Sequence, residues 1–322
     1  MTFFMPKACL VGRLLRLTAI GFLASVSAAS AQELFKSPGD AAAALAAAAR
    51  SSNVEQLDSI LGVRGREIIS SGDRVADAAD RERFVTAYDN RHSITEQQDK
   101  ATLVIGQDEF PFPIPLVRVN GQWKFDTEAG RDEILYRRIG RNELDAIQAS
   151  LAFADAQSEY AAKDRGQGVG TYAQRIISRP GKKDGLYWET APGEEPSPLG
   201  DIAAEAAAEG YRAGEKPQPF HGYYYKILKG QGPAAPGGAI SYVAGGKMIG
   251  GFGLLAYPAD YGNSGIMSFI VNHDGTVYQR DLGLATRRIA ANMRNFNPEK
   301  GWEKVTPPGD PKAEAGAAGK RP

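Results

Sequence analysis

Histidine and aspartate are the first residues to consider for metal binding or acid–base catalysis. The chain holds His92, His221 and His273, each more than fifty residues from the next, and no HExxH motif. A zinc site needs clustered ligands, so the sequence predicts none. Asp274 and Asp281 could offer oxygens to calcium, but two carboxylates fall short of the roughly six or more ligands that this ion takes. We therefore predict no metal ion and no cofactor.

The residue patterns of nucleophilic catalysis are also incomplete. Gly262-Asn263-Ser264-Gly265 is one residue short of the G-x-S-x-G turn of serine hydrolases. The glycine-rich stretch at residues 166–170 lacks the lysine of a phosphate-binding loop and is typical of a linker. The only cysteine is Cys9, which excludes disulfides and thiolate sites in the rest of the chain. We name no catalytic residue.

Two sets of side chains remain candidates for binding. Tyr257, Tyr261 and Asp281 form a candidate interaction surface, because amphipathic tyrosine suits interfaces. Alternation along strands would instead place some of these rings in the core. Trp123 and Asp126 are the candidate lining of a pocket. The alternative that we favour for them is that Trp123 lies in the core and Asp126 caps the helix that follows.

The first thirty-one residues have the pattern of a signal peptide. The start is purely cationic up to Arg16, and residues 17–28 form an apolar run of about a dozen residues, shorter than the roughly 20 that span a bilayer. Small residues at positions 29–31 form an A-x-A site, which predicts cleavage between Ala31 and Gln32. The alternative is an uncleaved signal anchor. We predict a periplasmic or secreted protein.

The charge of the chain argues against nucleic acid as a partner. The sequence has 38 basic and 38 acidic residues, and three of the basic ones lie within residues 1–31, which leaves 35 against 38 for the remainder. Nucleic-acid binding demands a concentrated basic surface, so we predict none. The hydrophobic share of 43% allows the chain to bury a sizeable core.

Local patterns predict the elements that must position these side chains. In the first half the main signals are capping residues, glycines that end helices and the turn pair Asn120-Gly121. They predict helices over residues 37–50, 53–61 and 73–88. They also predict strands over residues 101–105, 114–119 and 122–125. The second half predicts a helix that ends at Gly140, a new helix from Asn142 to about residue 162, a short helix over 201–211, a strand over 222–228 and a hairpin at Asp274-Gly275.

These elements predict an α+β fold. An N-terminal domain of helices and a curved antiparallel sheet is expected over residues 32–140, and a second domain with an antiparallel sheet over residues 141–305. A long helix connects the two. Residues 1–31 are the signal peptide, and residues 306–322 have nothing to bury and are predicted to be a disordered tail.

Several motifs carry a resemblance to known families. They are Phe112-Pro-Ile-Pro-Leu116, Trp123-Lys-Phe-Asp126, Arg137-Arg-Ile-Gly-Arg-Asn-Glu143, Tyr257-Pro-Ala-Asp-Tyr-Gly262 and Gly275-Thr-Val-Tyr-Gln-Arg-Asp-Leu-Gly283. With them the chain resembles an exported bacterial family called domain of unknown function 2950, whose name implies no activity. The segment 119–126 resembles a strand pair of the NTF2-like superfamily, in which a cone often holds a small-molecule cavity. The second half resembles the globular domains of type II pseudopilins. These resemblances imply an NTF2-like fold for the domain over residues 32–140 and a pilin-like fold for the domain over residues 141–305.

The sequence therefore favours a noncatalytic role. We expect an exported interaction or assembly protein of the cell envelope, with an unidentified envelope protein as its partner and no permanent membrane anchor. The alternative is a periplasmic small-molecule binder or enzyme that uses a cavity around Trp123 in the N-terminal domain.

Overall fold

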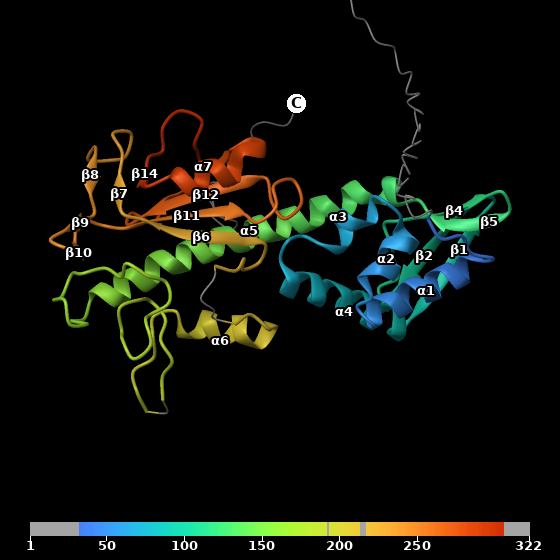
Figure 1. The fold of residues 1–322 in the computed structure, drawn as a ribbon, viewed down its shortest axis with the longest axis horizontal. Helices are drawn as coiled ribbons and strands as arrows, with labels where there is room; N and C mark the ends of the chain where they lie inside the picture. The colour runs from blue at the N-terminus through green and yellow to red at the C-terminus, as the bar shows by residue number, and fades with distance from the viewer. Residues whose placement is uncertain (1–31, 192, 213–216, 306–322) are drawn as a thin grey trace, which may run out of the picture. The chain divides into compact units, whose positions relative to one another are not determined.

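The computed structural model describes residues 32–191, 193–212 and 217–305 (Figure 1). Helices and mainly antiparallel sheets make up this part of the chain, which confirms the α+β class. The predicted signal segment with Ala31, and the predicted disordered tail, lie outside the described residues.

Side-chain caps begin three of the first four helices. Ser37, Asn53 and Asp73 each accept a hydrogen bond from a backbone N–H of the first turn that follows, as the sequence predicts. The helices are α1 (Pro38–Arg50), α2 (Val54–Leu61), α3 (Gly65–Ile69) and α4 (Arg74–Asn90). The short α3 has no side-chain cap, which is why the sequence does not predict it.

The first sheet is antiparallel and packs against α1 and α2. Its strands β1 (His92–Gln97), β2 (Lys100–Ile105), β4 (Leu116–Val119) and β5 (Gln122–Phe125) lie in the order β1-β2-β4-β5, and β3 (Phe110–Pro111) pairs with β2. Asn120 and Gly121 both have positive φ, at 51° and 80°, as a two-residue hairpin requires. The predicted hairpin is confirmed. Strand β1 escapes prediction because all but one of its side chains are exposed.

One helix of 35 residues, α5 (Thr127–Ala161), follows the first sheet. It runs unbroken through Gly140, so the predicted helix end at Gly140 and the predicted cap at Asn142 are wrong. The side chain of Asn142 instead donates to the carbonyl of Ser264 at 2.9 Å, a tertiary contact that local signals do not reveal. The predicted boundary between residues 140 and 141 falls inside this helix, and the division into two domains stays a prediction. No helix in the described ranges is long and apolar enough to cross a membrane.

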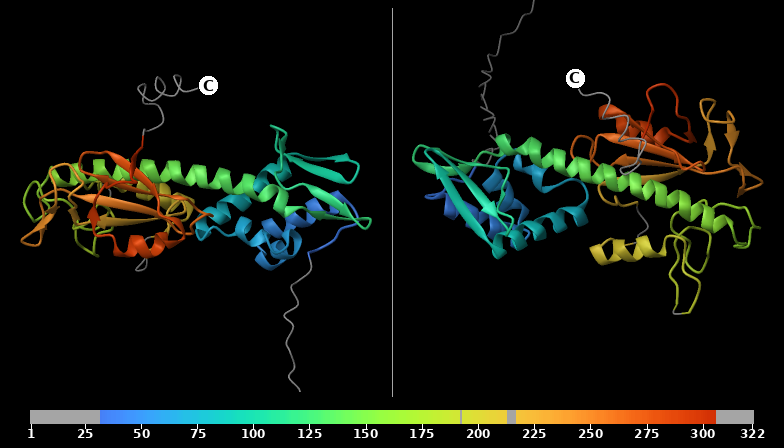
Figure 2. Two further views of the ribbon diagram at one scale, coloured as in Figure 1. Left: turned by 90° about the horizontal axis from the view of Figure 1, so that it is seen from above. Right: turned by 180° about the vertical axis from the view of Figure 1, so that it is seen from behind.

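The second sheet lies between α5 and α7 (Thr286–Asn292) (Figure 2). Its antiparallel strands follow the order β15-β13-β12-β11-β6. One face packs with α5 through residues such as Phe153, Leu254 and Phe269, and the other packs with α7 through Leu255, Ile270 and Ala290. The strands are β6 (Tyr223–Leu228), β11 (Gly253–Pro258), β12 (Met267–Asn272), β13 (Val277–Asp281) and β15 (Glu303–Lys304), and Asp274-Gly275 forms the predicted hairpin turn.

Shorter elements complete the second half of the chain. Helix α6 (Gly200–Glu209) confirms the predicted short helix there. Strands β7 (Gly230–Gln231), β8 (Ile240–Ser241) and β14 (Asn295–Phe296) form a small sheet, β9 (Val243–Ala244) pairs with β10 (Lys247–Met248), and the 3-10 turn η1 (Gly283–Ala285) leads into α7.

Candidate functional site

Tyr261 and Asp281, two residues of the predicted interaction surface, are in contact. Tyr261 lies in the turn after β11, and its Oη donates to Oδ2 of Asp281, at the end of β13, at 3.2 Å. Desolvation, followed by this hydrogen bond, raises the pKa of Tyr261. Oδ1 of Asp281 accepts from the backbone N–H of Gly283 at 2.7 Å, so the same carboxylate also fixes the turn that follows β13.

Tyr257, the third predicted residue, is half-buried on the face of the sheet that packs against α7. Its ring centroid lies 5.6 Å from that of Tyr224 on the neighbouring strand β6. Desolvation, followed by the neighbouring Tyr224, raises the pKa of Tyr257. Tyr257 therefore belongs partly to the core between the sheet and α7, and Tyr261 and Asp281 are the more accessible polar groups of the predicted surface.

Leu284 stands on the η1 turn between β13 and α7, shortly after Asp281 in the chain, and is 93% exposed. Thr286 Oγ1 donates to the carbonyl of Gly283 at 2.6 Å, so the turn is tied on both sides. A lone exposed leucine is ordinary on a protein surface, but this one stands on a turn that is fixed by Asp281, the hydrogen-bond partner of Tyr261. We call Tyr257, Tyr261, Asp281 and Leu284 the turn surface. The sequence did not single out Leu284.

Trp123 and Asp126, the predicted pocket residues, have different surroundings. Trp123 is 2% exposed in the core of the first sheet. Oδ1 of Asp126 accepts from the N–H of Ala129 at 3.4 Å and caps α5. Asp126 also lines a cavity of about 210 Å³, together with residues that include Gln32 and Leu61 but not Trp123. Both residues thus take the core and cap roles that the sequence favours, and the pocket stays a prediction.

The three histidines lie in separate places. His92 stacks on Tyr88, with ring centroids 3.9 Å apart. His221 Nε2 lies 2.7 Å from a carboxylate oxygen of Glu209, and His273 Nε2 lies 3.6 Å from one of Asp274. Among the described residues, no group of three or more His, Cys, Asp or Glu side chains is arranged to hold a metal ion.

The Gly262–Gly265 motif belongs to a closed hydrogen-bonded loop. Ser264 is fully buried, and its Oγ accepts from the N–H of Asp260 at 2.9 Å. Asn263 Nδ2 donates to Asp260 Oδ2 at 3.0 Å and to the carbonyl of Ser70 at 2.8 Å. The hydroxyl of Ser264 therefore stabilises the turn and is not presented to solvent as a nucleophile.

Side chains from α5 attach to this loop. The buried Arg138 donates to Asn263 Oδ1 at 2.5 Å and to the backbone carbonyls of Glu67 and Ile68 in α3. Glu143 Oε1 accepts from the backbone N–H groups of residues 266 and 267, both at 2.9 Å. With the contact from Asn142 to Ser264, these bonds join α3, α5 and the loop. We call Arg138, Asn142, Glu143, Asn263 and Ser264 the buried polar network.

Asp73 makes a further link between distant segments. Its Oδ1 accepts from the first turn of α4, whereas its Oδ2 accepts from Tyr211 Oη and from the N–H of Gly222, both at 2.9 Å. Desolvation, followed by the charge of Asp73, raises the pKa of Tyr211 far above its usual value. The carboxylate is thus fully engaged in holding the fold.

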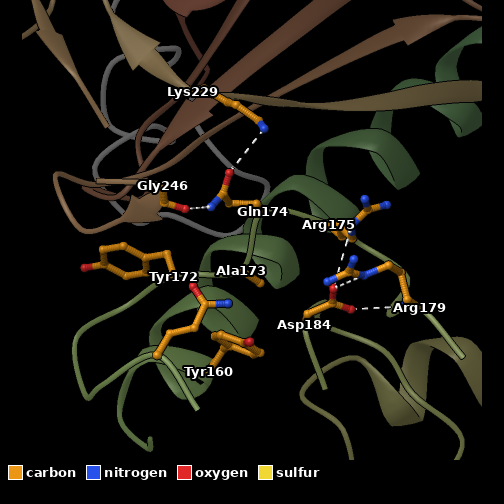
Figure 3. Close-up of a pocket in the computed structure, with 10 residues that line it drawn as sticks. Tyr160, Tyr172, Ala173, Gln174, Arg175, Arg179, Asp184, Lys229 and Gly246 are labelled. Carbon is orange, nitrogen blue, oxygen red and sulfur yellow. Dashed lines mark hydrogen bonds and ion pairs between the residues drawn. The ribbon is translucent and has the colours of Figure 1, made fainter. Parts of the chain in front are cut away.

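A cavity of about 460 Å³ opens in the second half of the chain, between the end of α5, the segment that follows it and the β9–β10 turn (Figure 3). Gln174 is fixed in its wall, because its Nε2 donates to the carbonyl of Gly246 at 2.7 Å and its Oε1 accepts from Lys229 Nζ at 3.2 Å. Three cations and one carboxylate line this cavity, together with Tyr160 and Tyr172: Arg175, Arg179, Lys229 and Asp184.

Asp184 organises the cationic side of the cavity. Arg179 donates to it from the backbone N–H at 2.9 Å and from Nε at 2.6 Å, and Arg175 Nε lies 3.9 Å away. Partial burial opposes ionisation, but these hydrogen bonds and charges prevail and lower the pKa of Asp184. The sequence interpretation missed this site. The one sequence feature that could have indicated this site is the group of basic residues within residues 175–183, which is not part of any recognised motif.

Comparison with known proteins agrees with the motifs quoted from the sequence. The family model described as "Protein of unknown function (DUF2950)" matches residues 32–305. The chain belongs to this family. The match includes the buried polar network, the turn surface and the cavity, so all three lie within the family region. No curated protein and no solved structure matches the chain.

Proposed function

We propose that this member of the family is an exported, noncatalytic protein that works by binding a partner in the cell envelope. The turn surface carries the proposal: an exposed leucine stands on a turn held by hydrogen bonds, and Asp281, which fixes this turn, also accepts from Tyr261 of the turn after β11. Aromatic side chains are enriched at protein interfaces, and a surface that is fixed in advance loses little entropy on binding.

The hydrogen bonds of two carboxylates, the buried Asp73 and the partly buried Glu143, support a noncatalytic role. Asp73 is committed to Tyr211, Gly222 and the cap of α4, and Glu143 is committed to two backbone N–H groups. A general acid or base must instead reach a proton of the substrate. These residues act as structural acceptors.

Export is part of the proposal. The N-terminal pattern of cations, apolar run and A-x-A site supports cleavage before Gln32, and the family match that begins at Gln32 supports the same position. The protein would then act in the periplasm or outside the cell.

The finer fold assignments are proposals as well. Helices α1 to α4 followed by an antiparallel sheet support an NTF2-like first half. The packing of the long α5 along the second antiparallel sheet supports a pilin-like second half. A small-molecule site in the first half is less well supported, because the cavity beside Asp126 has only about 210 Å³ and ligand sites usually have about 300 Å³ or more.

The test is site-specific photocrosslinking in living cells. A photoreactive residue replaces Leu284 in one tagged protein and Val63, which is 87% exposed in the loop between α2 and α3, in the control. We expect one envelope protein to be captured from position 284 and not from position 63. The capture should fall at least tenfold when Tyr257→Ala and Tyr261→Ala are added. Equal products from both positions, or capture that survives the tyrosine changes, would contradict the proposal.

A further inference from the structure

The cavity in the second half has the size and the fixed walls of a ligand site. Its volume of about 460 Å³ lies within the range of about 300–1,000 Å³ of small-molecule pockets. Gln174 is held by Gly246 and Lys229, and Asp184 by the backbone of Arg179, so two of the polar groups of the wall have fixed positions. The cavity shares no residue with the turn surface.

The charges around the cavity do not balance. Arg175, Arg179 and Lys229 are set against the single carboxylate of Asp184, which leaves a formal excess of two positive charges among the lining residues. Asp184 is shared between the two arginines, so neither has a carboxylate to itself. The described hydrogen-bond partner of the Lys229 ammonium is the neutral amide of Gln174.

Hydrogen-bond donors are also in excess. A guanidinium carries five N–H donors and an ammonium three, and all are donors only. The side chain of Arg175 is 54% exposed, and that of Arg179 is 62% exposed, so their remaining donors are accessible to a ligand. Planar guanidinium groups match the two oxygens of a carboxylate especially well.

We propose that this cavity binds a small polar molecule that carries a carboxylate, of the size and class of a uronic acid. The carboxylate meets the cations of Arg175, Arg179 and Lys229. The neutral body of the ligand meets the amide of Gln174 and the ring of Tyr172, groups that suit hydroxyl-rich molecules through hydrogen bonding and stacking.

Calorimetric titration of the purified protein with glucuronate tests the site. Glucose is the neutral probe of the same shape, and inorganic phosphate is the probe of charge without a carbohydrate body. We expect glucuronate to bind at least tenfold more tightly than either, and its binding to weaken as salt is added. Equal binding of glucose, tighter binding of phosphate, or no binding of glucuronate would overturn the proposal.

Two substitutions locate the binding. Arg175→Gln and Lys229→Gln each remove one cation from the cavity, whereas Lys300→Gln removes an exposed cation outside its lining and is the matched control. We expect at least a tenfold loss of glucuronate affinity in each cavity variant and less than a twofold change in the control. Circular dichroism checks that all three fold. Equal losses in all three variants would mean that overall charge, and not this cavity, attracts the ligand.

Discussion

Arg138 in the buried polar network and Arg175 in the cavity wall carry the same guanidinium into opposite surroundings. Arg138 is 6% exposed and donates to two backbone carbonyls and to Asn263. The side chain of Arg175 is 54% exposed, and its charge partner Asp184 lies 3.9 Å away and is shared with Arg179. The comparison teaches that a buried arginine whose two terminal nitrogens donate to acceptors in distant segments holds the fold together. An exposed arginine whose described charge partner is a shared carboxylate is available to a ligand.

The largest effect that the comparison predicts is the loss of Arg138. Arg138→Met would leave Asn263 Oδ1 and the carbonyls of Glu67 and Ile68 without their donor in a buried place. We expect the free energy of unfolding to fall by about 3–5 kcal/mol, measured by urea denaturation. Arg137→Met is the control, since that exposed neighbour pairs with Glu133 on the same helix and lies over the ring of Phe110. Because both contacts are at the surface, their loss should cost less than about 2 kcal/mol. Similar losses in both variants would break the comparison.

The contribution of a buried hydrogen-bond donor to stability can also be tested by changing the pH. Tyr242 is fully buried and donates to Gln231 Oε1 at 2.9 Å, and desolvation raises its pKa to about 12. The neutral phenol is favoured in the folded protein. Its stabilising effect is therefore complete below about pH 10, the pKa of an unfolded tyrosine, and is lost as the pH rises through about 12.

The measurement compares urea denaturation at pH 9 and pH 11 for the native protein and Tyr242→Phe. One pH unit above the unfolded pKa, Tyr242 alone should reduce the free energy of unfolding by about 1.4 kcal/mol. In Tyr242→Phe the free energy of unfolding should therefore fall by about 1.4 kcal/mol less between pH 9 and pH 11 than it does in the native protein. An identical pH dependence in the two proteins would show that Tyr242 does not carry this effect.

Gly140 tests whether α5 is as continuous as the buried polar network requires. Gly140 is exposed in mid-helix, and a Cβ added there would meet nothing within 4 Å. Alanine has the higher helix propensity, so Gly140→Ala should raise the free energy of unfolding by about 0.5–1 kcal/mol. The thermal midpoint of unfolding measures the change. A lower midpoint would mean that the helix bends or ends at this glycine.

The smallest effect is expected in the cavity wall. Arg175→Gln should change the free energy of unfolding by less than about 0.5 kcal/mol, because an exposed arginine with a distant partner contributes little to stability. Urea denaturation of Arg175→Gln and of Arg138→Met compares the contributions of the two arginines to the free energy of unfolding. A loss in Arg175→Gln that approaches the loss in Arg138→Met would assign the cavity arginine to the fold.

Elements with local signals could be predicted from the sequence. Ser37, Asn53 and Asp73 begin helices with their own side chains, and Asn120-Gly121 sets a hairpin through its backbone preference. Each depends on a few neighbouring residues, so one sequence is enough to find them.

Contacts between distant residues could not be predicted in the same way. The helix runs past Gly140 because Arg138 and Asn142 meet a loop more than a hundred residues away. The cavity combines Arg175 with Lys229 and Gly246, which are separated in the chain by a helix and several strands. Of the predicted interaction surface, the Tyr261–Asp281 pair is in contact, whereas the exposed Leu284 was missed because a single leucine has no distinctive pattern.

The separation of Arg138 from Asn263 also sets an order of events during synthesis. The two residues lie 125 positions apart, and a ribosome adds about 5–20 residues each second. Arg138 is therefore made about 6 to 25 seconds before the side chain that accepts its hydrogen bond. For that time the nascent α5 carries a charged group whose final burial place does not yet exist. The contact that joins α3 and α5 to the loop between β11 and β12 can therefore form only after residue 263 has been added to the chain.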